Sequence, residues 1–199
     1  MNMSKEEMKN KKEETYRKIL DASWEIAEKE GLEALSIRKV ATALKFAPNN
    51  LYNYFQNKNE LLYQLKKDAY EWTFAVGLKD IQEGATIRET MENAIRGLMH
   101  IAMKEPDRYI IMTSDIIMDS EEPLDKQINA KVADYIRKGI EQGEFKQSDP
   151  QMTATNIRIA LIAFIRWIAA HKQLTPEQAD GCLDNFLVIL FDGISDRKE

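Results

Sequence analysis

The sequence predicts an all-α protein of about nine helices. Apolar residues recur three and four positions apart through most of the 199 residues, and no segment shows the strict alternation of a β-strand. With 8 glycines and 5 prolines, the chain has too few turn-forming residues for a β-sandwich. A hydrophobic content of 44% together with 31% charged residues is typical of a globular chain.

The first helix is predicted from one apolar face that ends at a glycine. Gly31 follows the polar residues Glu28–Glu30 and is a typical helix stop. The members of the apolar face lie three or four residues apart and are Tyr16, Ile19, Leu20, Ser23, Trp24 and Ala27.

Two short helices are predicted next. Ser36 is a suitable N-cap for the first of them, and a break at residues 45–47 ends it. Pro48 has no N–H to donate, so it suits the first turn of the following helix, which we expect to continue to about Phe55.

The rest of the chain is predicted to form longer helices. Asn57 and Glu60 have the spacing of a capping box. The stripe expected after the break at residues 84–86 is Met91, Ile95, Leu98, Met99 and Ala102. Besides the helix that carries this stripe, the expected helices are residues 58 to about 79, 106 to about 119, 123 to about 142, 151–172 and 176–194.

The two short helices have the arrangement of a helix-turn-helix. The first would bury the apolar face formed by Ile37, Val40, Ala41 and Leu44, and Phe46 would fill the space between the helices. If Leu51 and Phe55 of the second helix point inward, its outward residues are Asn49, Asn50, Tyr52 and Asn53. Asparagine can form two hydrogen bonds with adenine, and a tyrosine hydroxyl can reach a phosphate. The pattern therefore favours a DNA-reading surface over an ordinary helical hairpin.

The segment that contains these two helices resembles the TetR family of transcriptional regulators. The resemblance lies in Leu51–Phe55 and Asn57–Leu62, and the upstream segments Ile26–Leu32 and Ser36–Ala41 fit the same pattern. It covers about residues 14–62. Beyond them, the length and the helical pattern also agree with the family.

The resemblance implies an N-terminal helix-turn-helix DNA-binding domain at residues 1–57 and a helical effector-binding and dimerisation domain at residues 58–199. It also implies a repressor that a small hydrophobic or amphipathic effector releases from a palindromic operator. The residues expected at the DNA are Ser36, Arg38, Lys45, Pro48, Asn49, Asn50, Tyr52, Asn53 and Lys58. Two departures affect the turn: Lys45 replaces the usual glycine, and Ala47 replaces the usual Ser or Thr N-cap.

The effector site is expected among apolar, aromatic and methionine side chains of the second domain, because methionine forms adaptable binding surfaces. Ordinary core is the alternative for each of them. The expected lining is Trp72, Met91, Ile95, Met99, Met103, Tyr109, Met112, Phe164 and Trp167, with Phe74 and Val76 close by. Candidates for its polar group are Arg158, Arg166, His100 and Asp115.

The last two helices are predicted to form a homodimer interface, because both are apolar nearly all round and need covering on two faces. In the final helix Val188 and Ile189 lie opposite the main stripe. That stripe is Leu183, Phe186, Leu187, Leu190, Phe191 and Ile194. In the preceding helix the excess apolar residues are Ile162, Phe164, Ile165, Trp167 and Ile168.

Other function classes find less support. An enzyme on a helical scaffold would need a catalytic cluster, and the sequence has no phosphate loop, nucleophile elbow or paired metal-ligand motif. The acidic residues between Asp115 and Glu122 could form a metal patch or simply end helices. A protein-interaction module without DNA binding is a further alternative, which Tyr52 and Lys58 disfavour. We expect no cofactor and no metal.

Residues 1–62 carry a net charge of about +1 and residues 63–199 about −6, so the first third of the chain is relatively basic and the rest is acidic. The lysine-rich start reads either as a solvated helix or as a DNA contact, and its lysines Lys5, Lys9, Lys11 and Lys12 are interleaved with Glu6, Glu7, Glu13 and Glu14. The single cysteine, Cys182, and the lack of a signal peptide or a long membrane span predict a cytoplasmic protein. A redox-sensing role for Cys182 is disfavoured because its helix is predicted to be buried.

Overall fold

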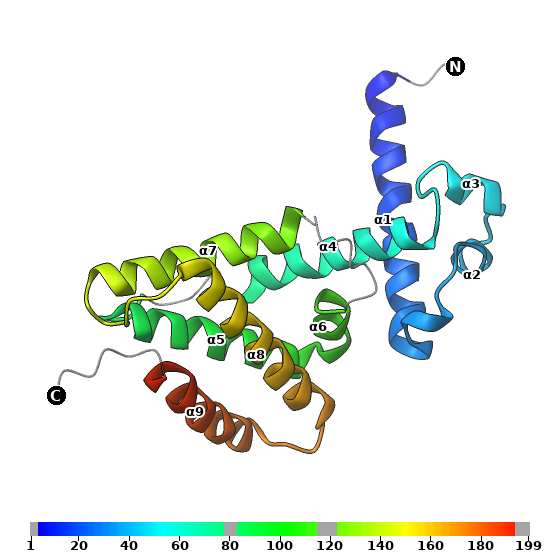
Figure 1. The fold of residues 1–199 in the computed structure, drawn as a ribbon. Coiled ribbons are helices and arrows are strands. Elements are labelled where there is room, and N and C mark those ends of the chain that lie inside the picture. The colour runs from blue at the N-terminus through cyan, green and yellow to red at the C-terminus, as the bar shows by residue number, and fades with distance from the viewer. Residues whose placement is uncertain (1–3, 78–82, 115–122, 194–199) are drawn as a thin grey trace. The chain divides into compact units, whose positions relative to one another are not determined.

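The computed structural model describes residues 4–77, 83–114 and 123–193. These residues form nine α-helices and one short 3-10 helix, which confirms the all-α prediction (Figure 1). By contacts the chain separates into two compact units, of which the first extends to Ala69 and the second starts at Tyr70, both within the helix α4. The boundary expected between residues 57 and 58 separates a DNA-binding domain from an effector domain. It concerns function and stays a prediction.

The helices begin and end close to the positions that the sequence predicts. In the first part of the chain they are α1 (Lys5–Glu30), the 3-10 helix η1 (Leu32–Ala34), α2 (Ile37–Ala43), α3 (Pro48–Tyr52) and α4 (Lys58–Gly77). In the rest they are α5 (Ile87–Lys104), α6 (Pro106–Met112), α7 (Pro123–Glu141), α8 (Pro150–Ala170) and α9 (Pro176–Asp192).

Two helices are shorter than predicted. α3 ends at Tyr52 instead of Phe55, although the amides of Tyr54 and Phe55 still donate to the Leu51 carbonyl at 2.9 Å. Phe55 is buried just beyond the end of α3, and α4 starts at Lys58. α6 ends at Met112, and residues 115–122, where it was expected to continue, lie outside the described residues.

In the first unit α1 packs against η1 and α2, α2 packs against α3, and side chains of α4 bond to α1. Ile19, Val40 and Leu61 are fully buried there. Asp68 joins α4 to α1, because its carboxylate accepts hydrogen bonds from Arg17 at 2.8 Å and from the Trp24 indole at 3.0 Å. Burial of each large apolar side chain contributes about 2 kcal/mol.

The turn between α2 and α3 has the hydrogen bonds of a Schellman motif. The Phe46 amide donates to the Ala41 carbonyl at 2.8 Å, and the Lys45 amide donates to Thr42 at 3.1 Å. Lys45 therefore adopts a φ of 56°, the left-handed conformation that costs a non-glycine residue about 1 kcal/mol. The position expected to hold a glycine is thus a left-handed position, and a lysine occupies it here.

The predicted capping box at the start of α4 has one hydrogen bond in place. The Asn57 side chain accepts from the Glu60 amide at 2.9 Å. Glu60, however, accepts from the Gln56 amide at 2.6 Å instead of from Asn57. Both side chains still bond free amides at the helix start, as a cap requires.

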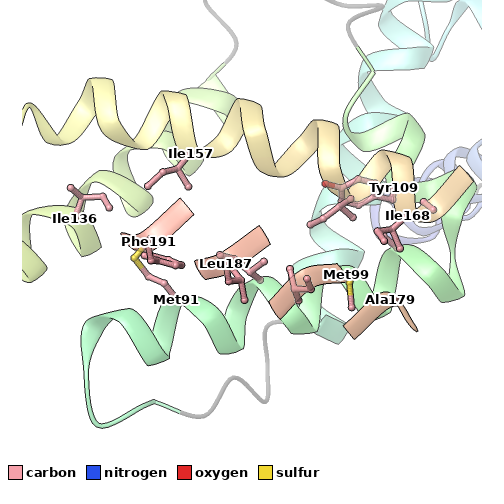
Figure 2. Packing of buried hydrophobic residues seen from close by; sticks show 14 of the residues in the cluster. Met91, Met99, Tyr109, Ile136, Ile157, Ile168, Ala179, Leu187 and Phe191 are labelled. Carbon is pink, nitrogen blue, oxygen red and sulfur yellow. The ribbon is translucent and has the colours of Figure 1, made fainter. Parts of the chain in front are cut away.

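The second unit is built around one apolar core between α5, α8 and α9. Figure 2 shows Met91 of α5, Ile157 of α8 and Phe191 of α9 meeting in it. Its fully or nearly fully buried members include Met99, Tyr109, Ile136, Ile168, Ala179 and Leu187.

A tight turn after α7 closes one end of this core. The amides of Glu144 and Phe145 both donate to the Gly139 carbonyl, at 2.8 and 3.1 Å. The Phe145 ring is buried and stacks on Phe191 at 6.0 Å between centroids. The Glu144 carboxylate accepts from the amides of Ile87 and Arg88 at 3.0 and 3.1 Å, so this turn also caps α5.

Ion pairs join α5 to α9 along one edge of the core. Arg96 contacts Asp180 at 2.7 Å and Asp184 at 2.5 Å, and His100 Nε2 lies 3.0 Å from Asp180. Burial raises the pKa of Asp180, but its bonds to Arg96 and His100 outweigh this and hold it below the ordinary value. These pairs link α5 to α9 at the rim of the core.

Among the described residues, α8 has the length and composition of a membrane-spanning helix. No long membrane span was expected from the sequence, whereas α8 (Pro150–Ala170) meets this criterion by length and composition. Such a helix is also what the core of a helical bundle requires, and Ile157, Ile165 and Ile168 are buried inside the unit.

Candidate functional site

The outward surface of α3 is polar and accessible. Leu51 and Phe55 are 0% and 1% exposed and anchor the helix to the unit. The opposite surface carries Asn49, Asn50, Tyr52 and Asn53, all exposed, with Pro48 exposed at the first turn. The structure thus brings the expected base-reading residues together on one face.

The expected phosphate contacts surround this face. The Ser36 hydroxyl accepts from the Lys39 amide at 3.2 Å, which confirms it as the N-cap of α2. Arg38 and Lys45 are exposed. Lys58 is partly buried, and its ammonium donates to the Glu33 carbonyl at 3.1 Å. Lys58 therefore also fastens the start of α4 to η1, a contact that sequence reasoning missed.

An aromatic contact supports α3 from behind. The Tyr16 ring stacks on Phe55 at 5.5 Å between centroids, and its hydroxyl donates to Gln64 at 2.9 Å. Sequence periodicity placed Tyr16 on the apolar face of α1 but could not name its partners, which lie about forty or more positions away along the chain.

The second unit contains a half-open pocket of about 780 Å³ between α5, α7 and α8. This volume lies in the range of small-molecule sites. The apolar lining is Met91, Ala94, Ile95, Ile128, Ala130, Val132, Ile157 and Leu161. The polar lining is Glu83, Thr90, Lys131, Asp134, Tyr135 and Lys138.

The predicted effector residues are not all gathered in this pocket. Met91 and Ile95 line it. Met99 and Tyr109 are buried in the core, where burial raises the pKa of the Tyr109 phenol, and Met103 and Met112 are partly buried against that core.

The predicted aromatic members have partners elsewhere in the second unit. Trp72 lies under the Arg108 guanidinium at 4.8 Å, and Phe164 stacks on Phe186 at 4.3 Å. Trp167 is 47% exposed and packs against His171. The side chains of Phe74 and Val76 lie outside the described residues.

The predicted polar candidates also have partners outside the pocket. Arg166 donates to the Thr113 carbonyl at 3.0 Å, His100 pairs with Asp180, and Arg158 lies 3.4 Å from the Asn129 side chain. Asp115 lies outside the described residues.

Sequence reasoning missed the contribution of α7, which supplies most of the polar lining. Lys138 bonds Asp134 at 3.0 Å, an interaction that raises the pKa of Lys138 and lowers that of Asp134. Tyr135 is 40% exposed beside them. Tyr135, a tyrosine on the exposed side of an amphipathic helix, was the sequence signal that could have indicated this contribution of α7.

Within the described part of the chain, no group of three or more His, Cys, Asp or Glu residues is placed to hold a metal ion. The acidic run that sequence reasoning considered, Asp115, Asp119, Glu121 and Glu122, lies outside that part.

The last two helices leave apolar side chains uncovered. On α8, Ile159 is 63% and Met152 62% exposed, and on α9, Ile189 is 68% and Val188 50% exposed. The stripe formed by Leu183, Leu187 and Phe191 is buried in the chain's own core. Of the residues expected at the dimer interface, Ile165 and Ile168 are buried as well, and Ile194 lies outside the described residues.

Two family models match the chain. Residues 19–65 match the bacterial regulatory proteins of the TetR family, and residues 84–187 match the tetracyclin repressor-like C-terminal domain. The chain belongs to the TetR family. It is a DNA-binding transcriptional regulator of this family, and the relatives reported below are transcriptional regulators.

This TetR-family chain is similar to characterised regulators along much of its length. It is 26% identical to the fatty acid metabolism regulator protein of Bacillus subtilis, over 66% of this chain and 71% of that protein. It is 22% identical to the repressor KstR2 of Mycobacterium tuberculosis, over 83% and 85%.

The fold of this TetR-family chain is also found in a solved structure of AibR in complex with isovaleryl coenzyme A and operator DNA. The TM-score is 0.66 at 21% identity, over 88% of this chain and 97% of AibR. This likeness concerns the fold.

Proposed function

We propose that a dimer of this chain binds a palindromic operator and that a small hydrophobic or amphipathic effector releases it. Residues 1–57 form the DNA-binding domain and residues 58–199 the effector and dimerisation domain. The protein acts in the cytoplasm, where its operator lies. The observation that carries the proposal is the exposed asparagine and tyrosine face of α3, fixed from behind by Leu51 and Phe55.

The residues of this face and those around it are suited to two kinds of DNA contact, one with base edges and one with phosphates. Asn49, Asn50 and Asn53 have the amide groups that read adenine edges in the major groove. Ser36, Arg38, Lys45, Tyr52 and Lys58 carry donors that suit phosphates, and Pro48 sets the first turn of the reading helix.

The first prediction separates base reading from phosphate binding. Asn50→Ala is expected to change the sequences recovered from a randomised duplex library, because it removes a base contact. Tyr52→Phe is expected to weaken binding several-fold on every duplex alike, because a phosphate contact carries no sequence information. Both are measured by gel shift at ~150 mM salt, near physiological.

The matched control is Asn10→Ala, which removes an exposed asparagine of α1 outside this surface. It is expected to leave both affinity and sequence preference unchanged. If Asn50→Ala recovered the wild-type sequences and Tyr52→Phe bound as tightly as wild type, α3 would not be the reading helix.

The effector is expected in the pocket between α5, α7 and α8. Its lining is mainly apolar on α5 and α8 and mixed on α7, which adds Lys131, Asp134, Tyr135 and Lys138, and this suits a molecule with an apolar body and a polar group. Lipid-like or acyl compounds are the first to test. Similar proteins are named for fatty acid metabolism and for ketosteroids, and AibR was solved with isovaleryl coenzyme A.

The second prediction tests this site. Ala94→Phe fills the pocket, so it is expected to weaken effector binding at least about tenfold while DNA binding stays at the wild-type level. Effectors are found by screening fatty acids, steroids and their coenzyme A thioesters for a rise in melting temperature and for release of DNA.

Ala85→Phe is the control, because Ala85 is exposed and does not line the pocket. It should respond to the effector as wild type does. An Ala94→Phe protein with unchanged effector affinity would place the site elsewhere in the second unit.

The dimer is proposed to form through α8 and α9, which both leave apolar side chains uncovered. A two-fold axis would place the two α3 helices about 34–36 Å apart, the spacing of successive major grooves. Pairing of the two last helices from each copy would bury Ile159 and Ile189 away from water.

A further inference from the structure

We infer that the lysine face at the start of α1, formed by Lys5, Lys9 and Lys12, is a second DNA contact that binds operator phosphates beside the major-groove site. The inference rests on the proposed DNA binding by α3. It assigns a role to a lysine cluster that the sequence left open between a solvated helix and a DNA contact.

The first turns of α1 form a capped helix. The Ser4 hydroxyl accepts from the Glu7 amide at 3.1 Å, and the Glu7 carboxylate accepts from the Ser4 amide at 2.7 Å. This reciprocal capping box fixes the start of the helix. Yet residues 4–14 are all exposed, and the first buried residue is Ile19. The start of the helix therefore contributes little to the core and is available for another role.

The charges on this segment are sorted by face. Lys5, Lys9 and Lys12 lie four and three residues apart, on the face that continues into Tyr16. No ion pair of these three lysines is found within the described residues. Glu14, in contrast, pairs with Lys18 at 2.6 Å. The lysine face thus carries three positive charges, with Glu13 beside it, although the whole segment is nearly neutral.

The lysine face is continuous with the proposed reading surface. A shallow groove is lined by Lys9, Lys12, Glu13, Tyr16 and Tyr54. Tyr54 follows α3 by two residues, and Figure 1 shows α3 beside the N-terminal half of α1. The Tyr16 ring, stacked on Phe55, joins the two parts rigidly.

The occupant that fits is the phosphate backbone of the operator. Three lysines on one rigid face match the regular negative charge of a duplex. A duplex held by α3 continues past the end of this helix, so its flanking phosphates lie next to that face. Such contacts add affinity and salt dependence without adding sequence information.

The test compares two triple variants of the full-length chain. The first variant removes the lysine face by combining Lys5→Gln, Lys9→Gln and Lys12→Gln. The second, the control variant, combines Lys11→Gln, Lys18→Gln and Lys29→Gln. It removes the same amount of charge from a different face of α1, where all three lysines are exposed. Each is titrated against the duplex selected with the wild-type protein, once trimmed to its half-sites and once with a helical turn of flanking DNA on each side.

The face variant is expected to bind the long duplex at least about tenfold more weakly than wild type at ~150 mM salt, with a salt slope smaller by about 2 to 3. On the trimmed duplex it is expected to bind nearly as well as wild type. The control variant is expected to retain most of the wild-type slope. Circular dichroism melting checks that all three proteins are equally folded.

Each other outcome counts against the inference. If the face variant matches wild type on the long duplex, or if both variants lose affinity equally, the lysine face makes no local contact and net charge explains any effect. In those cases wild-type binding still supports α3 as the reader. If wild type binds no duplex, the proposed function and the inference fall together.

Discussion

Replacing Gly139 with alanine is expected to lower the free energy of unfolding of the second unit by about 3 kcal/mol. A Cβ at this position would lie 2.2 Å from a carbon of the Phe145 ring. That ring cannot move aside, because it is buried and stacked on Phe191. The change would also disturb the turn whose Glu144 carboxylate caps α5. Urea unfolding followed by circular dichroism measures the loss.

A double-mutant cycle with Phe145 supplies the control for this expectation. Phe145→Leu alone should destabilise the unit by about 1 kcal/mol through lost packing. In that background Gly139→Ala should cost clearly less than in wild type, because the clash is relieved. Equal costs in both backgrounds would show that the tight approach of Phe145 to Gly139 does not limit this position.

Combining Ile159→Glu with Ile189→Glu is expected to convert a dimer into a monomer. If α8 and α9 pair with their copies, each substitution places an unpaired charge in an apolar interface. A cost of about 4 kcal/mol weakens dimerisation on the order of a thousandfold. Analytical ultracentrifugation at micromolar concentration should then show a monomer, and operator binding should fall to that of one half-site.

The control for the added negative charge combines Gln142→Glu with Gln147→Glu. Both glutamines are exposed in the connection between α7 and α8. This variant should remain a dimer that binds the operator. Sedimentation of the wild-type chain as a monomer, or an intact dimer in the isoleucine variant, would refute the proposed interface.

Local signals in the sequence determined where most helices begin and end. Ser36 caps α2, Pro48 and Pro176 open their helices, and Gly31 ends α1 with a φ of 84°. A cap satisfies backbone groups within three or four residues, so its signal is complete in the local sequence. The outward face of α3 was equally predictable, because Leu51 in the helix and Phe55 just after it both point inward and fix its rotation.

Only the tertiary structure decided which apolar residues line a pocket and which fill the core. Met91 and Met99 share one stripe of α5, yet Met91 borders the pocket and Met99 is fully buried. The difference depends on α7 and α8, whose approach to α5 has no local sequence signal. Helical periodicity tells which face of a helix is covered. What covers that face is set by packing between segments distant in the chain, and so is the second role of Lys58 at the Glu33 carbonyl.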